Sequence, residues 1–303
     1  MIKSIISYFK GILGYSILIL NTIIGFILLL PIAYLKKLTS NNNIKKYCLM
    51  YLHKVGKTWI QINYLTIRIS NKLNWRITGL EQLLNLPKDK WYLLIANHQS
   101  WADVFILQFI FRNHLPFQKY FIKEQLRQFP LMGFIWEAID CPFLKRLDNK
   151  NLSANPVLQG ADLLEIKEKS KKFKLLPSTI VSFLEGTRFT TQKHQQQQSE
   201  YKFLLKPKAG GIACVLQELH KEIKGIVDVS LFYPNKNVTL WDLYTGRMNN
   251  IAIKINFITI PKWLSEKHLD NLEYELYKDE FQIWLKKIWL EKDQFMQDQN
   301  ILS

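Results

Sequence analysis

The spacing of hydrophobic residues changes twice along the chain and divides it into three parts. Gly11–Leu35 carries no charged residue and is rich in Ile and Leu, and about 20 such residues suffice to cross a bilayer. From residue 75 onward, short apolar runs alternate with helical patterns, and near the C-terminus apolar residues recur at helical spacing among charged ones. We therefore expect a membrane-associated helical segment at 1–70, an α/β domain at 71–262 and a C-terminal amphipathic helix at 263–303 that packs on this domain.

The N-terminal apolar stretch is better explained as a membrane segment than as a core helix, because a core helix seldom runs so far without a charge. Asn21, Gly25 and Pro31 leave open a kinked or re-entrant helix instead of a span. Lysines are more numerous after the stretch than before it, which favours a cytoplasmic position for the bulk of the protein. Tyr47–Ile69 predicts an amphipathic helix that lies either on the membrane or over the sheet.

The middle of the chain predicts an α/β fold with a mixed, mainly parallel sheet and helices on both faces, because apolar strands alternate with helices. The expected strands are Trp75–Thr78, Trp91–Ala96, Tyr120–Ile122, Ile139–Phe143, Thr179–Leu184, Ile226–Phe232 and Ile251–Ile260. The expected helices are 101–112, 124–138, 159–172 and 207–220. We interpret the Gln tract at His194–Gln198 as a solvated loop.

Composition limits the kinds of molecule that this domain is expected to bind. The net charge of +16 favours polyanions, such as an anionic membrane surface, a phosphorylated substrate or nucleic acid. The three cysteines, Cys48, Cys141 and Cys214, are scattered and odd in number, which argues against both a disulfide framework and a zinc site. We expect them to be small buried apolar residues in a reducing compartment.

The first candidate for chemistry follows the expected strand Trp91–Ala96. His98 lies on the loop after this strand, and Asp103 falls in the first turn of the next helix, for which Ser100 is the expected N-cap. In a tight turn the Asp103 carboxylate reaches one ring nitrogen of His98 and leaves the other free to take a proton. This is the orienting half of a catalytic triad without its protein nucleophile. A structural histidine is the alternative.

A second candidate follows the expected strand Thr179–Leu184. Glu185, Gly186, Thr187 and Arg188 form a turn at the end of that strand, where α/β sheets bind ligands. Gly186 permits a tight turn, and the Arg188 guanidinium is suited to a phosphate group through paired hydrogen bonds. Glu185 either holds the turn or pairs with Arg188, and a loop salt bridge is the alternative to a phosphate site.

A third set of residues lies between these two motifs. Lys123 follows a short apolar strand, Gly133 stands in a helix that Pro130 interrupts, and Arg146 follows the next apolar run. Solvated positive charge explains isolated lysines equally well. Arg146, which follows an apolar strand, is the hardest of them to explain in that way.

Taken together, the motifs resemble those of the 1-acylglycerol-3-phosphate acyltransferase family, whose members share an Asn-His-x4-Asp box. Four blocks stand in the family's order, namely Asn97-His98 to Asp103, Lys123-x2-Leu126-x3-Pro130-x2-Gly133 leading to Arg146, Glu185 to Arg188, and Ile226–Tyr233. The extended first and third blocks are similar to a branch that contains eukaryotic lysocardiolipin acyltransferases and bacterial inner-membrane relatives. The resemblance covers residues 75–260, and it departs from the family at Asp228, near the usual place of a proline in the fourth block.

The resemblance implies a glycerol-3-phosphate acyltransferase-like fold and an acyltransferase activity. The acceptor would be a lysophospholipid, with 1-acylglycerol-3-phosphate as the default, and the donor acyl-CoA or acyl-carrier protein, with no further cofactor and no metal. His98 would act as general base oriented by Asp103 in a motif supported by Asn97 and Gly133. Residues Glu185, Gly186, Thr187 and Arg188 would bind the acceptor phosphate, with Lys123 and Arg146 as weaker candidates. The expected location is the bacterial inner membrane, with the domain facing the cytoplasm.

Several alternatives stay open at this stage. The acceptor is either 1-acylglycerol-3-phosphate or another lysophospholipid. A non-catalytic membrane lipid binder fits the charge, whereas no nucleic-acid motif appears and we expect no nucleic-acid partner. Cys141 as an acyl-accepting nucleophile lacks a neighbouring base, and a metal site built from His98, Asp103 and His114 matches no standard spacing.

Overall fold

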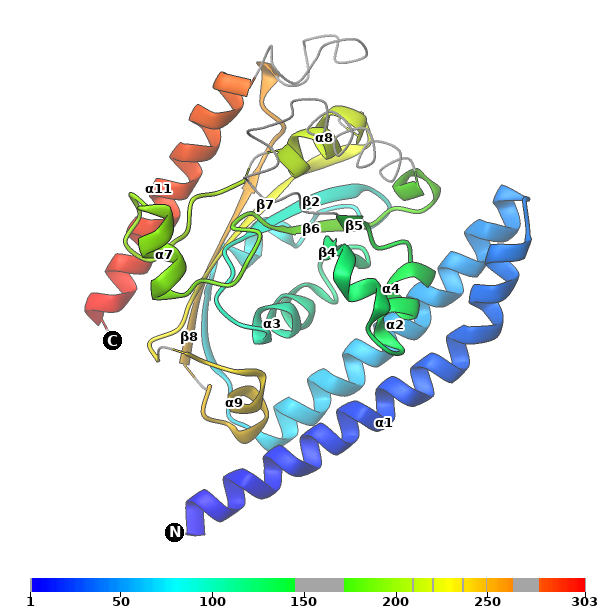
Figure 1. Cartoon of the computed structure of the whole chain (residues 1–303), viewed down its shortest axis with the longest axis horizontal. Helices are drawn as coiled ribbons and strands as arrows, with labels where there is room; N and C mark the ends of the chain where they lie inside the picture. Colours follow the sequence, from blue (N-terminus) through cyan, green and yellow to red (C-terminus); the bar gives the residue numbers. More distant parts are fainter. Residues whose placement is uncertain are drawn as a thin grey trace.

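The chain begins with a helical hairpin of α1 (Ile2–Leu38) and α2 (Asn42–Ser70), which lie side by side along one side of the molecule (Figure 1). The structure is a computed structural model and describes residues 2–144, 172–208, 210–219, 221–235, 237–248, 250–263 and 278–302. The Asn41 side chain begins α2 by accepting hydrogen bonds from the backbone N–H groups of Asn43 and Ile44. Both N-terminal helices expected from the sequence are therefore present, and each is longer than its apolar stretch.

Six strands form the central sheet, in the order β1-β8-β7-β2-β6-β3. Every neighbouring pair is parallel except β7 and β8. The expected mixed, mainly parallel sheet is thus confirmed. The strands are β1 (Asn74–Thr78), β2 (Trp91–Ala96), β3 (Gln118–Tyr120), β6 (Thr179–Phe183), β7 (Ile223–Phe232) and β8 (Asn250–Ile258).

Helices cover both faces of this sheet, as expected (Figure 1). Side chains alternate along β2, so that Leu94 packs with α2 and α3 (Ala102–Phe111), whereas Leu93 packs with α8 (Gly210–Leu219) and α11 (Lys278–Leu302). Both faces of β2 are covered by apolar side chains. This explains why its sequence is a continuous apolar run with no polar face.

Shorter elements complete the described chain. They are η1 (Leu80–Leu83), β4 (Ile122–Lys123), η2 (Glu124–Gln128), α4 (Met132–Ala138), β5 (Phe143–Leu144), η3 (Lys172–Leu175), α7 (Thr191–Gln197) and α9 (Leu240–Thr245). The interrupted helix at 124–138 is confirmed as two pieces, with the break at Pro130 and at Leu131, which has a φ of 59°. The expected helix at 159–172 lies outside the described residues except for Lys172, which begins η3, and the part of the C-terminal segment at 264–277 lies outside them as well.

Three local predictions are wrong. The expected strand Tyr120–Ile122 is divided, because Gln118–Tyr120 pairs with β6 in the central sheet, whereas Ile122 and Lys123 pair with β5. Ile139–Phe143 is not a strand, because Asp140 takes a φ of 59° and Cys141 N–H bonds back to the carbonyl of Trp136 at the end of α4. Only Phe143 and Leu144 pair, with β4. The Gln tract is the helix α7 and not a loop, since Thr190 caps it by accepting a hydrogen bond from the backbone of Lys193.

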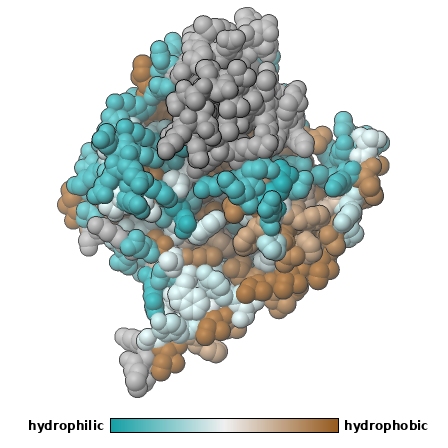
Figure 2. Space-filling model, in the orientation of Figure 1, coloured by the Kyte–Doolittle hydropathy of each residue, from teal (hydrophilic) through white to brown (hydrophobic). Residues whose placement is uncertain are grey.

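Helix α1 stays in contact with the rest of the protein at both of its ends. Ser7 donates to the carbonyl of Thr245 at 2.8 Å, and Lys10 donates to the carbonyl of Ser70 at 2.6 Å. Near the other end, Lys36 pairs with Asp140 at 2.8 Å. The outward face is lined by exposed Ile, Leu and Phe side chains, which form a hydrophobic band along this edge (Figure 2).

Candidate active site

The loop after β2 carries the first candidate motif and is anchored to the neighbouring strand. Asn97 is fully buried and makes two hydrogen bonds to the backbone of Leu231 on β7, with its Nδ2 donating at 2.9 Å and its Oδ1 accepting at 2.8 Å. Both main-chain groups of Leu231 are thereby satisfied by one side chain. Asn97 thus fixes the backbone immediately before His98.

His98 and Asp103 meet as expected from their spacing. The distance from Nδ1 of His98 to Oδ2 of Asp103 is 2.8 Å, and the Asp103 side chain is fully buried. The same oxygen accepts the backbone N–H groups of Gln99 and Ser100, and the hydroxyl of Tyr233 donates to the other oxygen. The carboxylate therefore has four donors around it, which compensates for its burial and fixes its orientation.

The start of α3 differs in detail from the expected N-cap. The helix begins at Ala102, and Ser100 uses its hydroxyl to accept from the Ala102 N–H and to donate to the carbonyl of Val238. Asp103 still lies in the first turn of α3. The carboxylate closes the turn through the backbone of Gln99 and Ser100, so that Asp103 holds the loop as well as the imidazole.

The imidazole of His98 is held on its flat side as well. Its ring stacks on the ring of Phe183 at the end of β6, with centroids 4.0 Å apart and an angle of 14° between the planes. The side chain keeps 14% of its surface exposed, and Nε2 makes no hydrogen bond to any residue that the structure describes. One ring nitrogen is thus engaged by Asp103, and the other is available to a substrate.

The loop after β6 lies against the loop of His98. Phe189 donates its backbone N–H to the carbonyl of His98 at 2.7 Å, and the Arg188 guanidinium lies 5.2 Å from the ring centroid of Trp101. Gly186 has a φ of 66°, a conformation that favours glycine. Thr187 accepts a hydrogen bond from Lys193, which also donates to the carbonyl of Arg188. The motifs of His98 and Arg188, distant in sequence, therefore meet at one end of the sheet.

Glu185 lies beneath the surface in this arrangement. Its side chain is fully buried, and its two oxygens accept the backbone N–H groups of His98 at 3.0 Å and of Leu205 at 3.4 Å. Burial raises the pKa of Glu185 to about 8, while the two N–H donors and the charge of Lys292 act in the opposite direction. Glu185 thus holds the backbone of His98, and Arg188 is the exposed cation of the motif.

The structure describes only part of the third set of residues, Lys123, Gly133 and Arg146. Lys123 is exposed at the end of β4, and Arg146 lies outside the described residues. Gly133 sits so close to the carbonyl of Arg127 that a Cβ would come within 1.9 Å of that oxygen. Gly133 is therefore required by packing of α4 against η2.

Several residues around the site were missed by sequence reasoning. Tyr233 falls inside the fourth block, yet nothing in the local pattern pointed to Asp103 as its partner. Asp228, which departs from the family pattern, pairs with Lys292 of α11 at 2.7 Å, and both side chains are buried. Lys292 stands on the apolar stripe of an amphipathic helix. A lysine at such a position indicates a buried acidic partner, and this signal could have pointed to Asp228.

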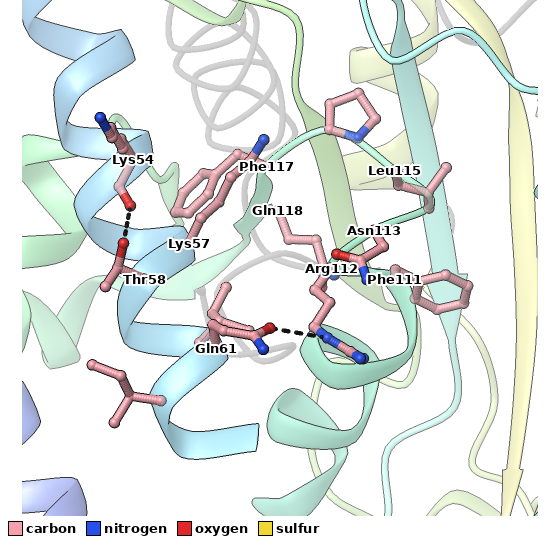
Figure 3. Close-up of a pocket in the computed structure, with 13 residues that line it drawn as sticks. Lys54, Lys57, Thr58, Gln61, Phe111, Arg112, Asn113, Leu115, Phe117 and Gln118 are labelled. Atoms are coloured by element: carbon pink, nitrogen blue, oxygen red, sulfur yellow. Dashed lines mark hydrogen bonds between the residues drawn. The ribbon is translucent and has the colours of Figure 1, made fainter. Parts of the chain in front are cut away.

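A cavity of about 320 Å³ lies at the end of α3 that is far from His98 (Figure 3). Neither the motif of His98 nor the motif of Arg188 lines it. It is bounded by Lys54, Lys57 and Gln61 of α2 and by the segment that follows α3. Arg112 crosses toward Gln61 and donates to it through Nε at 3.2 Å. This cavity is separated from His98 by the length of α3, about 15 Å.

The two alternative chemistries find no support in the described part of the chain. His98 and His114 lie at opposite ends of α3, and no group of three His, Cys, Asp or Glu side chains there is placed to hold a metal ion. Cys141 is buried, and burial raises the pKa of its thiol to about 12. A thiol in this state is a poor nucleophile at neutral pH.

Comparison with known proteins agrees with this geometry. A family model described as Acyltransferase matches residues 76–232, which include the loops of His98 and Arg188, and the chain belongs to this family. The chain is 26% identical over 192 residues to the 1-acyl-sn-glycerol-3-phosphate acyltransferase delta of Bos taurus, a match that covers 59% of this chain and 45% of the relative. Its match to the mouse protein of the same name is 26% identical over 218 residues and covers 68% of this chain and 52% of that relative.

A more extended match links the chain to a yeast protein. The 2-acyl-1-lysophosphatidylinositol acyltransferase of Saccharomyces cerevisiae is 23% identical over 339 residues, covering 94% of this chain and 83% of the relative. By contrast, the chain spans about half the length of the mammalian relatives that it matches. The family of the chain is therefore established, and the relatives act on lysophospholipids according to their names.

Proposed function

We propose that this protein transfers a fatty acyl group from a thioester donor to the free hydroxyl of a lysophospholipid. The observation that carries the proposal is the buried Asp103 carboxylate, which engages Nδ1 of His98 and leaves Nε2 unbound beside the loop of Arg188. Binding alone would not require a fixed imidazole with one ring nitrogen held by a buried carboxylate. A general base requires both features.

The reaction follows from this geometry. With Nδ1–H donating a hydrogen bond to Asp103, Nε2 carries the lone pair and removes the proton of the acceptor hydroxyl as the oxygen attacks the thioester carbonyl. The new C–O bond forms, the C–S bond breaks, and the proton on Nε2 passes to the departing thiolate. Asp103 stabilises the imidazolium between these steps. The acceptor hydroxyl is itself the nucleophile, so no serine or cysteine is needed.

The loop of Arg188 would bind the acceptor phosphate. Its guanidinium is exposed at the rim, stacked over Trp101, where a fork of N–H groups suits phosphate oxygens. Thr187 and Gly186 belong to the same turn and allow close approach of the headgroup. Lys123 and Arg146 remain additional candidates for the phosphate of the acceptor or of the donor.

The acceptor we favour is 1-acylglycerol-3-phosphate, which would give phosphatidic acid, with acyl-CoA or acyl-carrier protein as donor. The mammalian relatives bear that substrate in their names. The yeast relative, which matches almost the whole chain, favours a second candidate, a lysophospholipid with a larger headgroup such as lysophosphatidylinositol. Both acceptors carry a phosphate and a free hydroxyl on the same glycerol, and both fit a site with one guanidinium at its rim.

We further infer that the protein is attached to the cytoplasmic face of a bacterial inner membrane along α1. Within the described chain, α1 is the helix long and apolar enough to cross a bilayer. With 37 residues it is about 55 Å long, against about 30 Å of hydrocarbon. Yet Ser7 and Lys36, near its two ends, both contact the same domain. A helix held at both ends is expected to lie along the membrane surface rather than cross it.

The position of α1 can be tested by labelling its two ends. In sealed vesicles, cysteines introduced at Ser4 and at Ser40 should react with a membrane-impermeant thiol reagent from the same side. The unmodified protein supplies the background from its native cysteines. Reaction of the two positions from opposite sides would show that α1 crosses the membrane.

The function itself is tested with a panel of acceptors. Purified protein in mixed micelles is given acyl-CoA or acyl-carrier protein, and free thiol is measured with lysophosphatidic acid, lysophosphatidylinositol or no acceptor. Thiol release that depends on a lysophospholipid, together with formation of the diacyl product, is the expected result. Thiol release that is the same without an acceptor, or no release with any pair, would overturn the proposal.

A further inference from the structure

The buried face of α11 is apolar except for two charged residues near the middle of the helix. Phe281, Leu285 and Trp289 are buried before them and Met296 after them, and the two charged residues are Lys292 and Asp293. Lys292 keeps 1% of its surface exposed and Asp293 keeps 5%. Burying a charged group is costly unless partners compensate for the lost water. The partners of these two charged residues therefore indicate what α11 does for the protein.

Lys292 is bound to the C-terminal half of β7. Its ammonium donates to Oδ1 of Asp228 at 2.7 Å, to the carbonyl of Val229 at 2.6 Å and to the hydroxyl of Ser230 at 3.2 Å. These contacts use its three donors. The next residue on β7 is Leu231, whose backbone is held by Asn97 through two hydrogen bonds. The ammonium thus fixes the strand at the place where the residue before His98 is anchored.

Trp289 reaches the same loop by a second route. Its indole N–H donates to the carbonyl of Leu205 at 2.9 Å, and the N–H of Leu205 donates to Oε2 of Glu185 at 3.4 Å. The other oxygen of Glu185 accepts the N–H of His98 at 3.0 Å. A continuous path of hydrogen bonds therefore runs from α11 to the backbone of His98.

Asp293 reinforces this second route. Its carboxylate accepts the backbone N–H groups of Lys202 at 3.0 Å and of Phe203 at 2.8 Å, so that α11 holds the 201–205 segment at more than one point. The segment follows α7 and leads back to Glu185. A loop bound in this way has little freedom to change the position of Leu205.

We propose that Trp289 and Lys292 are positioning residues, through which α11 fixes Glu185 and Asn97 and thereby the backbone of His98. The kinetic consequence rests on the proposed function, because a fixed His98 affects turnover only if its imidazole acts as the base. Neither residue makes a hydrogen bond or an ion pair with His98, Asp103 or Arg188 in the described structure. Loss of their contacts is therefore expected to lower kcat and to leave the KM of both substrates unchanged.

The decisive variant is Trp289→Phe, which removes the indole N–H and keeps an aromatic ring. We expect kcat to fall roughly three- to tenfold, the range that one hydrogen bond sustains. The backbone amides of His98 and Leu205 should exchange with solvent about tenfold faster. Lys286→Ala is the matched control, because Lys286 lies on the same helix and pairs at 3.1 Å with Glu200 at the exposed surface. It should change neither quantity.

A second comparison tests Lys292 in the same assays. Lys292→Met alone leaves Asp228 buried without its cation, so the double variant Lys292→Met with Asp228→Asn removes both charges together. If it folds, it should also exchange the His98 amide faster and turn over more slowly at unchanged KM. If it does not fold, Trp289→Phe still decides the matter.

The amide exchange tests whether α11 holds the loop, and kcat tests whether this matters for turnover. Slower turnover together with faster exchange of the two amides supports the proposal. Unchanged amide exchange in Trp289→Phe, or faster exchange with unchanged kcat, would overturn it. If the wild-type protein transfers no acyl group, the proposed function fails, while the amide measurement still shows whether α11 holds the loop.

Discussion

Helices α3 and α11 lie on opposite faces of the sheet, and each holds a different part of the structure around His98. Helix α3 supplies Asp103, which contacts the imidazole directly and stands five residues away in the sequence. In the described part of the chain, helix α11 makes no hydrogen bond to the imidazole and holds the residues around it, through Lys292 on β7, Trp289 on the segment that reaches Glu185, and the Met296 sulfur, which accepts a hydrogen bond from Asn97 at 3.9 Å. The His98–Asp103 pair is thus formed by residues that are close in the sequence, whereas the residues that hold its backbone in place come from a distant part of the chain.

The two helices also differ in how they relate to known proteins. The region that matches the family model, residues 76–232, includes α3 and excludes α11. Asp228 belongs to the matched region, and its partner Lys292 lies beyond it. A charge buried inside the shared domain is therefore compensated by an element outside it. This difference predicts that substitutions on the α3 side affect chemistry far more than those on the α11 side.

The largest effect should come from Asp103→Asn. The amide oxygen can take the place of Oδ2 and still accept from the backbone of Gln99 and Ser100 and from Nδ1 of His98, but the neutral amide no longer stabilises the imidazolium, and its NH2 group then faces the hydroxyl of Tyr233. We expect kcat to fall about 10³- to 10⁴-fold while the melting temperature changes little. Asp89→Asn, at an exposed loop position, is the control. A fall of less than about tenfold would remove Asp103 from the reaction.

Arg188→Ala should have the next largest effect. Loss of the guanidinium is expected to lower kcat/KM for a phosphate-bearing acceptor by roughly 10- to 100-fold, mainly through KM, and to leave the KM of the acyl donor unchanged. Arg76→Ala removes an exposed arginine of β1 and serves as the matched control. Acceptor saturation curves that coincide for wild type and variant would show that Arg188 lies outside the acceptor site.

A smaller effect is expected from Tyr233→Phe. The hydroxyl of Tyr233 donates to the Asp103 oxygen that does not face His98, so its loss weakens the orientation of the carboxylate without removing its charge. One buried hydrogen bond to a charged group supports a loss of about tenfold in kcat. Steady-state kinetics at saturating substrates measures this change, and an unchanged kcat would show that Asp103 is held well enough by the backbone.

The last prediction concerns stability and not turnover, through the pH dependence of the free energy of unfolding at Glu185. Burial raises its pKa from 4.5 to about 8, so the folded protein binds this proton more tightly than the unfolded chain. This group therefore makes the free energy of unfolding decrease as pH rises from about 4.5 to 8. Glu185→Gln lacks the ionisation, so the stability advantage of wild type over this variant should shrink across that interval. A constant difference in unfolding free energy from pH 5 to pH 8 would contradict the assignment.

The comparison also explains how much the sequence could predict. The pairing of His98 with Asp103 was predictable because one short turn determines it, and β2 was predictable because both of its faces are buried. The meeting of the His98 and Arg188 loops was predictable from the ends of β2 and β6, which are parallel neighbours. In each case the signal is contained in a short run of residues or in a general rule of α/β sheets.

The remaining features depend on long-range contacts that leave no local pattern. Tyr233 and Asp103 are 130 residues apart, and Lys292 and Asp228 are 64 apart. The false strand at Ile139–Phe143 was an apolar run interrupted by a positive φ at Asp140, which apolar periodicity does not register. The Gln tract became a helix because the preceding Thr190 caps it, a signal that its composition obscured.

The account depends above all on His98 as the base that activates the acceptor hydroxyl. The most direct test measures lysophospholipid-dependent thiol release from the acyl donor by His98→Ala, with folding checked by its melting temperature. We expect a folded protein with activity reduced at least about 10³-fold, because the variant lacks the imidazole that takes the proton. A folded His98→Ala variant that releases thiol at the wild-type rate would contradict it.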